Sequence, residues 1–239
     1  MSYPKTLMLA VCLLLTASAA IAQSTIYLEP RLGFGTFRMQ SMKELQRVMI
    51  ANTGLDAKAT DAFGSYAQFG LNVVSDIGEQ SRIGFFLEHG STGGRVAYAD
   101  YSGEFLLDTP LNYNAFGGLF YHHQSIKESR LRYVAGTELH MLMTNMNLQA
   151  YTKINSQTES SEDKFNSYGL GFKPFVGLQY PLMLFPTILS IGYFVDTNYP
   201  FHVPGELDQQ LVIDSNNKTI HPGWSGLRVN VSVAIPIVR

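Results

Sequence analysis

The chain has 239 residues, of which 46% are hydrophobic and only 15% are charged, and its formal net charge is −2. Soluble domains carry about 25% charged residues, so this chain is poor in charge. A near-neutral balance without a basic block gives no support for nucleic-acid binding. Beyond the N-terminal segment no run of about eighteen apolar residues occurs, so the sequence predicts no membrane-spanning helix.

The N-terminal segment 1–22 has the three parts of a secretory signal peptide. Lys5 supplies a positive start, LMLAVCLLL is a short apolar core, and Ala20-Ile21-Ala22 fits the small-residue cleavage rule. The only cysteine, Cys12, lies in this segment, so cleavage leaves a mature chain without disulfides or cysteine-based metal sites. We expect a cleaved signal peptide at 1–22 and a single exported domain at 23–239, which suits a bacterial envelope protein.

Eight segments alternate between apolar and polar residues, the pattern of β-strands with two different faces. Most have about the ten residues that a tilted membrane-crossing strand needs. They are Ile26–Phe37, Phe63–Val74, Ile83–Gly90, Leu111–Tyr121, Leu131–Met141, Ser167–Tyr180, Ile188–Asp196 and Leu227–Ile237. The expected fold is all-β, an eight-stranded antiparallel up-and-down transmembrane barrel.

The connections between these segments alternate in length. The second, fourth and sixth are short, whereas the other four are long and polar, at 39–62, 91–110, 144–164 and 197–223. Outer-membrane barrels show this alternation, with short periplasmic turns and long external loops. The first long connection reads SMKELQRVMIANTG, in which Ser41 and Glu44 fit a capping box and Met42 and Leu45 share one face. A short helix that covers the barrel mouth is expected there.

The closing segment, GLRVNVSVAIPIVR, alternates apolar and polar residues, which leaves open which face of each strand points inward. An apolar face packs inward in a soluble protein but meets lipid in a membrane barrel. The pooled polar faces carry ten glycines, among them Gly118, and six uncharged polar residues: Gln68, Asn72, Asn112, Asn114, Asn230 and Ser232. Glycine in a strand marks close approach by another group, which a narrow lumen supplies, so we expect the polar faces to point inward.

The same polar faces carry four acids and four bases. They are Glu29, Arg31, Glu88, Arg132, Glu138, Lys173, Asp196 and Arg228. We expect a paired lumenal charge network, because unpaired buried charges would be prohibitive, in a largely filled interior. The alternative is that several of these charges sit in water at strand ends. The opposite faces, which include Leu119 and Tyr121, are expected to meet lipid.

Few residues suggest a specific site. In the second long connection, Arg95, Tyr98, Asp100 and Tyr101 are contact candidates, because tyrosine and arginine are frequent at binding surfaces. His140 and Glu138, with Ser167 and Asp196 toward the same end, could imitate a serine–histidine–acid site, but no local motif supports it. No catalytic residue, cofactor or metal site is predicted.

The export signal, the eight alternating strands, the long connections on one side and the closing WSGLRVNVSVAIPI strand resemble the small outer-membrane β-barrel family, which includes the OmpA-type transmembrane domain and OmpX-like barrels. The resemblance implies a non-enzymatic monomer that the barrel assembly machinery inserts, in contact with outer-membrane lipid and lipopolysaccharide. It implies a structural or surface-interaction role, such as adhesion, with a surface protein as partner. Three alternatives stay open: a narrow porin-like ion or solute channel, a lipid-modifying enzyme, and a soluble barrel with an apolar ligand cavity.

Overall fold

The computed structural model describes residues 25–54, 56–101, 103–155, 157–213 and 218–238, and the predicted signal peptide lies outside these ranges. Within them, eight antiparallel strands close a ring in the order β1-β3-β4-β5-β6-β7-β8-β13 and back to β1. The strands are β1 (Ile26–Gly35), β3 (Tyr66–Ile77), β4 (Ser81–Ala99), β5 (Gly103–Ser125), β6 (Arg132–Ile154), β7 (Gln157–Leu182), β8 (Phe185–Asn198) and β13 (Gly226–Val233). The predicted all-β, eight-stranded barrel is confirmed.

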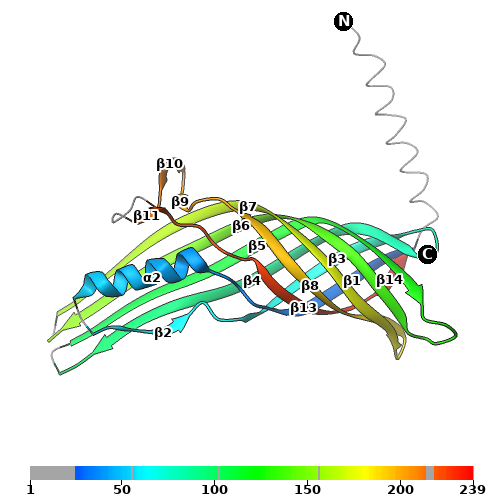
Figure 1. Ribbon diagram of the computed structural model, residues 1–239, viewed down its shortest axis with the longest axis horizontal. Helices are drawn as coiled ribbons and strands as arrows, with labels where there is room; N and C mark the ends of the chain where they lie inside the picture. Colours follow the sequence, from blue (N-terminus) through cyan, green and yellow to red (C-terminus); the bar gives the residue numbers. More distant parts are fainter. Residues whose placement is uncertain (1–24, 55, 102, 156, 214–217, 239) are drawn as a thin grey trace, which may run out of the picture.

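Smaller elements complete the described chain. One helix follows β1, and the others are short strands: α2 (Gln40–Thr53), β2 (Lys58–Ala62), β9 (His202–Val203), β10 (Glu206–Gln210), β11 (Val212–Ile213), β12 (Lys218–Thr219) and β14 (Ile235–Val238). Among the described residues, helical segments of the length and apolar character needed to cross a membrane do not occur. Ile26 in β1 pairs with Val238 in β14 at one end of the barrel, which we call the terminal end. Helix α2 lies toward the opposite end, the loop end (Figure 1).

Four neighbouring strands extend far beyond the rest at the loop end (Figure 1). Strands β4, β5, β6 and β7 have 19, 23, 23 and 26 residues, whereas β1 has 10 and β13 has 8. The prediction of long loops at 91–110 and 144–164 is therefore wrong, because both segments are mostly paired strand. We call this projecting part of β4–β7 the extended wall.

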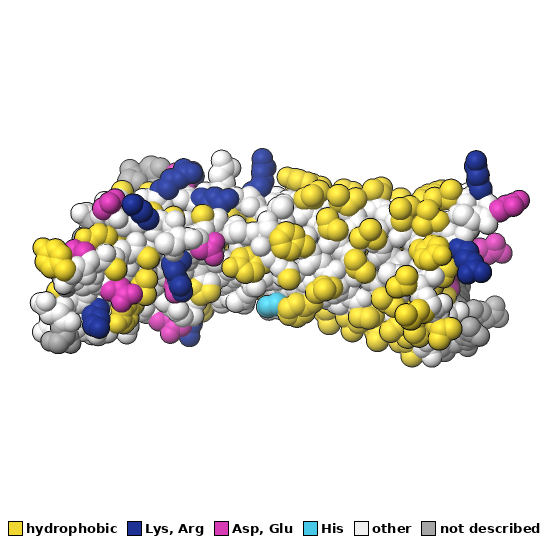
Figure 2. All heavy atoms as spheres, turned by 90° about the horizontal axis from the view of Figure 1, so that it is seen from below, with side chains coloured by type: hydrophobic (Ala, Val, Ile, Leu, Met, Phe, Trp, Pro, Cys, Tyr) yellow, Lys and Arg dark blue, Asp and Glu magenta, His cyan; other side chains and the backbone are white. Residues whose placement is uncertain are grey.

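The outer surface near the terminal end is an apolar belt. Figure 2 shows hydrophobic side chains over this half of the molecule and charged ones mainly over the other half. In the closing strand, Val231 is 44% exposed and points outward, whereas Arg228 is 2% exposed and points inward. The valines of this strand therefore face outward, as predicted, and the belt is the surface expected of a membrane-spanning barrel.

The predicted facing of β5 is wrong. Leu119 and Tyr121 are buried inside the barrel, whereas Asn112, Asn114 and Gly118 lie on its outer face. Within the belt the inward face of β5 contributes the apolar side chain of Leu119 as well as the hydroxyl group of Tyr121, so the interior is not polar at every position. Higher up, the extended wall has water outside and packed loops inside, so asparagines point outward there and the apolar residues between them point inward.

Helix α2 lies where it was predicted but begins differently. Its N-cap is Met39 in the left-handed conformation, with no side-chain cap hydrogen bond, so the predicted capping box of Ser41 and Glu44 is wrong. Gly54, with φ of 65°, ends the helix. Met42 is fully buried, so the apolar face of the helix points into the loop end of the barrel.

Strand β7 carries Pro174 without losing its register. Pro174 pairs with Thr137 on one side. On the other side the ladder to β8 is interrupted at Lys173 and Pro174, and it resumes at Phe175 opposite Gly192. Proline has no N–H to donate, so part of the pairing with β8 is lost, and the strand continues in the same register without a bulge.

Candidate functional site

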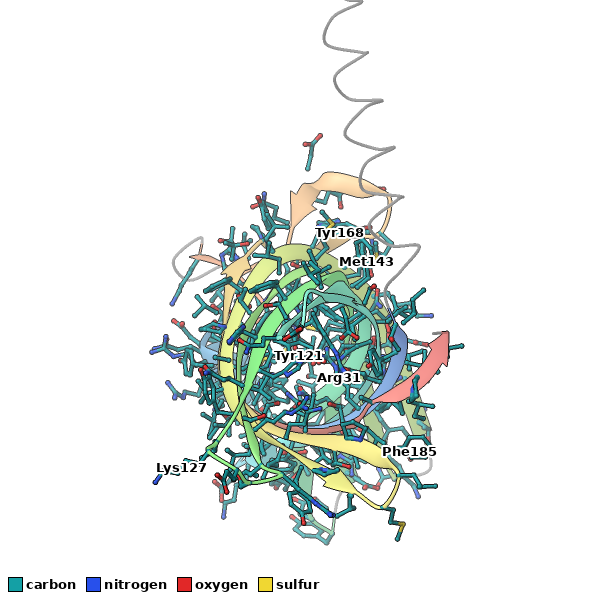
Figure 3. The ribbon with its side chains drawn as sticks, turned by 90° about the vertical axis from the view of Figure 1, so that its right-hand side faces the viewer. Arg31, Tyr121, Lys127, Met143, Tyr168 and Phe185 are labelled. Atoms are coloured by element: carbon teal, nitrogen blue, oxygen red, sulfur yellow. The ribbon has the colours of Figure 1, made fainter. Side chains whose placement is uncertain are left out.

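A cluster of paired charges, which we call the central network, fills the middle of the barrel (Figure 3, where Arg31 lies within the ring of strands). Arg31 joins two carboxylates, with Nη2 at 2.5 Å from Oε2 of Glu88 and Nη1 at 2.8 Å from Oε1 of Glu138. Lys173 Nζ lies 2.8 Å from Oε2 of Glu138. All four side chains are buried, so two cations balance two carboxylates away from water.

Neutral polar groups complete this network toward the neighbouring strands. The Tyr113 hydroxyl lies 2.7 Å from Oε1 of Glu88 and 3.2 Å from Oε1 of Gln68, and either oxygen can accept its single hydrogen. The amide of Gln68 donates to Oδ1 of Asn230 at 2.8 Å. These contacts join β3, β4, β5 and β13 across the lumen, so the network stabilises the ring as well as its own charges.

A second charge cluster lies nearer the terminal end. Arg82 Nη1 lies 3.2 Å from Oε1 of Glu29, and its Nε lies 2.8 Å from Oδ1 of Asp76. The Tyr121 hydroxyl donates to Oε1 of Glu29 at 2.6 Å, and Asn72 donates to Oε2 at 3.2 Å. The Tyr121 hydroxyl is therefore part of the polar interior, and Figure 3 shows this residue within the ring of strands.

The loop end is closed by an apolar cluster that we call the plug. Trp224 donates its indole N–H to the Thr144 hydroxyl at 2.9 Å and packs edge-on against Phe37, with ring centroids 5.0 Å apart. Arg228 donates to the carbonyls of Trp224 and Thr36 at 2.6 Å each. The remaining plug residues are buried and come from both the first and the last long connections: Met39, Met42, Leu45, Phe201, Ile213 and Ile220.

Six of the eight predicted network residues are buried inside the barrel: Glu29, Arg31, Glu88, Glu138, Lys173 and Arg228. They are divided among the central network, the second cluster and the plug. Arg132 is not among them, because it begins β6 and is exposed at the terminal end. Asp196 belongs to the plug region instead, where it accepts the backbone N–H of Trp224 at 3.0 Å and the Ser225 hydroxyl.

Four members of the two charge clusters were not predicted to belong to them: Asp76, Arg82, Tyr113 and Tyr121. Arg82 and Asp76 lie in what reads as a polar turn, SDIGEQSR. The position of Arg82 could have been predicted from strand alternation. It is an even number of residues from Glu88 in the same strand, so both side chains lie on the same face. Tyr113 and Tyr121 were missed because a tyrosine can bury its ring and still hydrogen-bond a carboxylate.

The contact candidates lie on the hairpin between β4 and β5, beyond the belt. Arg95 forms a two-bond ion pair with Asp108, at 2.5 and 2.7 Å, and these hydrogen bonds raise the pKa of Arg95. The Tyr98 hydroxyl donates to Asp100 at 2.8 Å, which raises the pKa of Tyr98. Tyr101 is 103% exposed, so this ring is fully open to water.

The structure does not assemble a serine–histidine–acid site. The His140 ring is buried between Phe86 and Phe194, with centroids 4.4 and 4.7 Å away, and its Nε2 lies 3.0 Å from Glu138. Ser167 donates instead to the carbonyl of Tyr199 at 2.7 Å. Asp196 contacts the plug, as above. Among the described residues no group of three histidine, cysteine, aspartate or glutamate side chains is placed to hold a metal ion.

No protein-family model and no curated protein sequence matches the chain. Among solved structures, it is similar to Neisserial surface protein A (NspA), with 15% identity, 87% of this chain and 96% of that chain covered, and a TM-score of 0.29. The outer membrane protein OprG from Pseudomonas aeruginosa has 12% identity, 90% and 97% coverage, and a TM-score of 0.43. Ail, the attachment invasion locus protein of Yersinia pestis, has 10% identity, 89% and 99% coverage, and a TM-score of 0.33.

All three TM-scores lie below 0.5, so these likenesses carry no argument about function. The fold is established by the paired strands of this chain. Its closed ring, its outward apolar belt and its polar interior give it the architecture of a small outer-membrane β-barrel.

Proposed function

We propose that the protein is a monomeric outer-membrane barrel with a closed lumen, exported by a cleaved signal peptide, that acts through its exposed loop end. The observation that carries this proposal is the filling of the interior. Paired charges occupy the middle of the lumen and the plug occupies the loop end. An eight-stranded barrel is just wide enough for side chains to fill, so neither ions nor solutes have an open path.

The extended wall favours a structural or surface-interaction role. It carries paired strand well beyond the belt, and its β4–β5 hairpin bears the fully exposed ring of Tyr101. Exposed aromatic rings at the tip of a rigid support are suited to contacts with another surface, because tyrosine is enriched at interfaces. The partner class that fits this hairpin is a surface protein.

Single-channel recording in planar bilayers tests the closed lumen. We expect the folded wild-type protein to give no discrete conductance steps. Stable unitary steps that change in size with Glu88→Ala would contradict the proposal, since they would place the permeation path through the central network. Glu162→Ala is the matched control, because this carboxylate is exposed on the extended wall and lies outside the lumen.

A further inference from the structure

The outward side chains of β4 to β7 form rows that run across these four strands, because the register is continuous from one strand to the next. Going toward the loop end, the first row is apolar: Leu87, Phe116, Met141 and Leu170. The next is mixed: His89, Asn114, Met143 and Tyr168. The third, which we call the amide row, is polar throughout: Ser91, Asn112, Asn145 and Asn166.

These rows mark a change from an apolar to a polar outer surface along the wall. Successive rows are two residues apart, roughly 7 Å along the strand, so the wall changes from apolar to polar within about two rows. Tyr168 is half exposed in the mixed row, where an interfacial tyrosine belongs. The amide row therefore belongs to the polar part of the wall, on the side of the belt where the sugars and headgroups of the outer leaflet are expected.

Below the amide row the belt is indented. A hollow of about 720 Å³ lies there, and its wall is almost wholly apolar: Leu71, Val73, Phe85, Leu87, Leu139 and Leu170 are among its lining residues. Gly118 forms part of its floor, and a Cβ built at this glycine meets no atom within 4 Å. An adjoining hollow of about 430 Å³ shares Leu71 and Leu87 and reaches His89 and Asn114. An apolar slot thus leads up to the polar rows.

At the amide row two polar hollows meet on either side of Asn112. One of about 690 Å³ includes Tyr66, Arg95 and Asp108, and one of about 350 Å³ includes Asn145 and Lys164. Asn145 donates to Asn112 at 3.3 Å. A primary amide has two donor hydrogens and an acceptor oxygen with two lone pairs, so this single bond leaves further capacity for the hydroxyl groups of a sugar.

We propose that this outer wall binds one lipopolysaccharide molecule of the surrounding leaflet, with an acyl chain in the apolar slot and sugar hydroxyls on the amide row. The two halves of the site select this class of ligand together. A phospholipid could fill the slot but has few hydroxyls for the amides, and a soluble glycan could use the amides but has nothing for the slot. Arg95 and Lys164 border the polar hollows, but their charges are paired with Asp108 and Glu162, so the selection rests on the hydroxyl groups of the sugar. The inference rests on the proposed outer-membrane location.

Binding in nanodiscs of phosphatidylcholine tests the inference with three probes: rough lipopolysaccharide, phosphatidylglycerol and the delipidated core oligosaccharide. Wild type should bind rough lipopolysaccharide in preference to both others. Gly118→Leu places a side chain in the slot from a position where a Cβ meets no protein atom within 4 Å, so it should weaken this binding. The double variant Asn112→Ala with Asn145→Ala removes amide contacts and should weaken it about tenfold, the effect of two lost hydrogen bonds. Phosphatidylglycerol binding should not change in the double variant.

Val229→Leu is the matched control, since it adds bulk to the outer face of β13, across the ring from β5, and should bind as wild type does. Every variant is first checked for the compact, heat-modifiable gel band of a folded barrel. A wild-type protein that never enters membranes would overturn the proposed function. A folded barrel that binds phosphatidylglycerol or the free core oligosaccharide as tightly as rough lipopolysaccharide would overturn this inference alone, and so would unchanged binding in both slot and amide variants.

Discussion

Replacing Arg31 by methionine removes a buried cation that contacts two carboxylates, at 2.5 Å and 2.8 Å. Lys173 then remains beside Glu138, and the Tyr113 hydroxyl remains beside Glu88. Two carboxylates would share one cation in an interior with little water. Breaking a buried ion pair by removing one partner costs about 3–5 kcal/mol. We therefore expect the free energy of unfolding of Arg31→Met to fall by about that amount.

Urea unfolding in lipid vesicles measures this difference, with the fluorescence of the single tryptophan, Trp224, as the reporter. Trp224 is buried in the plug, so its emission should shift when the barrel opens. Arg95→Met is the matched control. Its ion pair with Asp108 also has a 2.5 Å contact, but the Arg95 side chain is 55% exposed, and exposed pairs contribute about 0–1 kcal/mol. Equal losses in the two variants would refute the view that the central network stabilises the barrel through buried charge pairing.

Three further outcomes follow from the same contacts. Tyr121→Phe keeps the ring but removes the hydroxyl bound to Glu29 at 2.6 Å, so urea unfolding should show a loss of about 2 kcal/mol; no loss would mean that the bond is unimportant. Val231→Lys places a charge on the lipid face and should cost about 2–4 kcal/mol in vesicles, whereas a soluble-type outer surface would tolerate it. Asn147 donates to Glu162 at 2.7 Å and, together with Lys164, lowers the pKa of Glu162. Asn147→Leu should therefore raise that pKa toward its ordinary value in an NMR titration. Because the folded-state pKa is the lower one, this contact favours the folded state above the ordinary pKa and loses its effect as the pH falls, and an unchanged pKa would contradict the assignment.

The barrel and most of its interior charges could be predicted because strand alternation is a local property. Residues such as Arg31 and Glu138 alternate with apolar neighbours, so their face is visible in a short window of sequence. Their partnership is not visible, since they are 107 positions apart and meet only through the register of several strands. The burial of Arg82 was not predicted for a related reason, because the residues around it have the composition of a polar turn.

The facing of β5 could not be predicted from alternation, because alternation defines two faces without saying which one meets water. Near the terminal end lipid surrounds the strand and Tyr121 points inward; higher up, Asn112 points outward into the polar zone. One strand thus crosses two environments that demand opposite polarity. Similarly, the polar composition of 91–110 and 144–164 predicts loops, although these segments are mostly paired strand with water on one side.

Helix α2 illustrates the limit of local capping signals. Its apolar spacing was sufficient to predict the helix, and Met42 does point into the plug. Its first residue is set by tertiary contacts instead, since Met39 is buried and its backbone N–H bonds to the carbonyl of Gly223 at 3.0 Å. That contact joins the first long connection to the last one and could not be read from Ser41 and Glu44.

We expect the apolar belt to face lipid around a closed, polar interior. Comparing boiled and unboiled samples of the outer-membrane fraction on a gel tests it most directly, since a membrane barrel keeps its compact fold in detergent until it is heated. We expect to find the protein in this fraction, with the unboiled sample running as a separate, heat-modifiable band. Recovery as a soluble periplasmic protein would contradict it, because the valines of the closing strand would then be exposed to water.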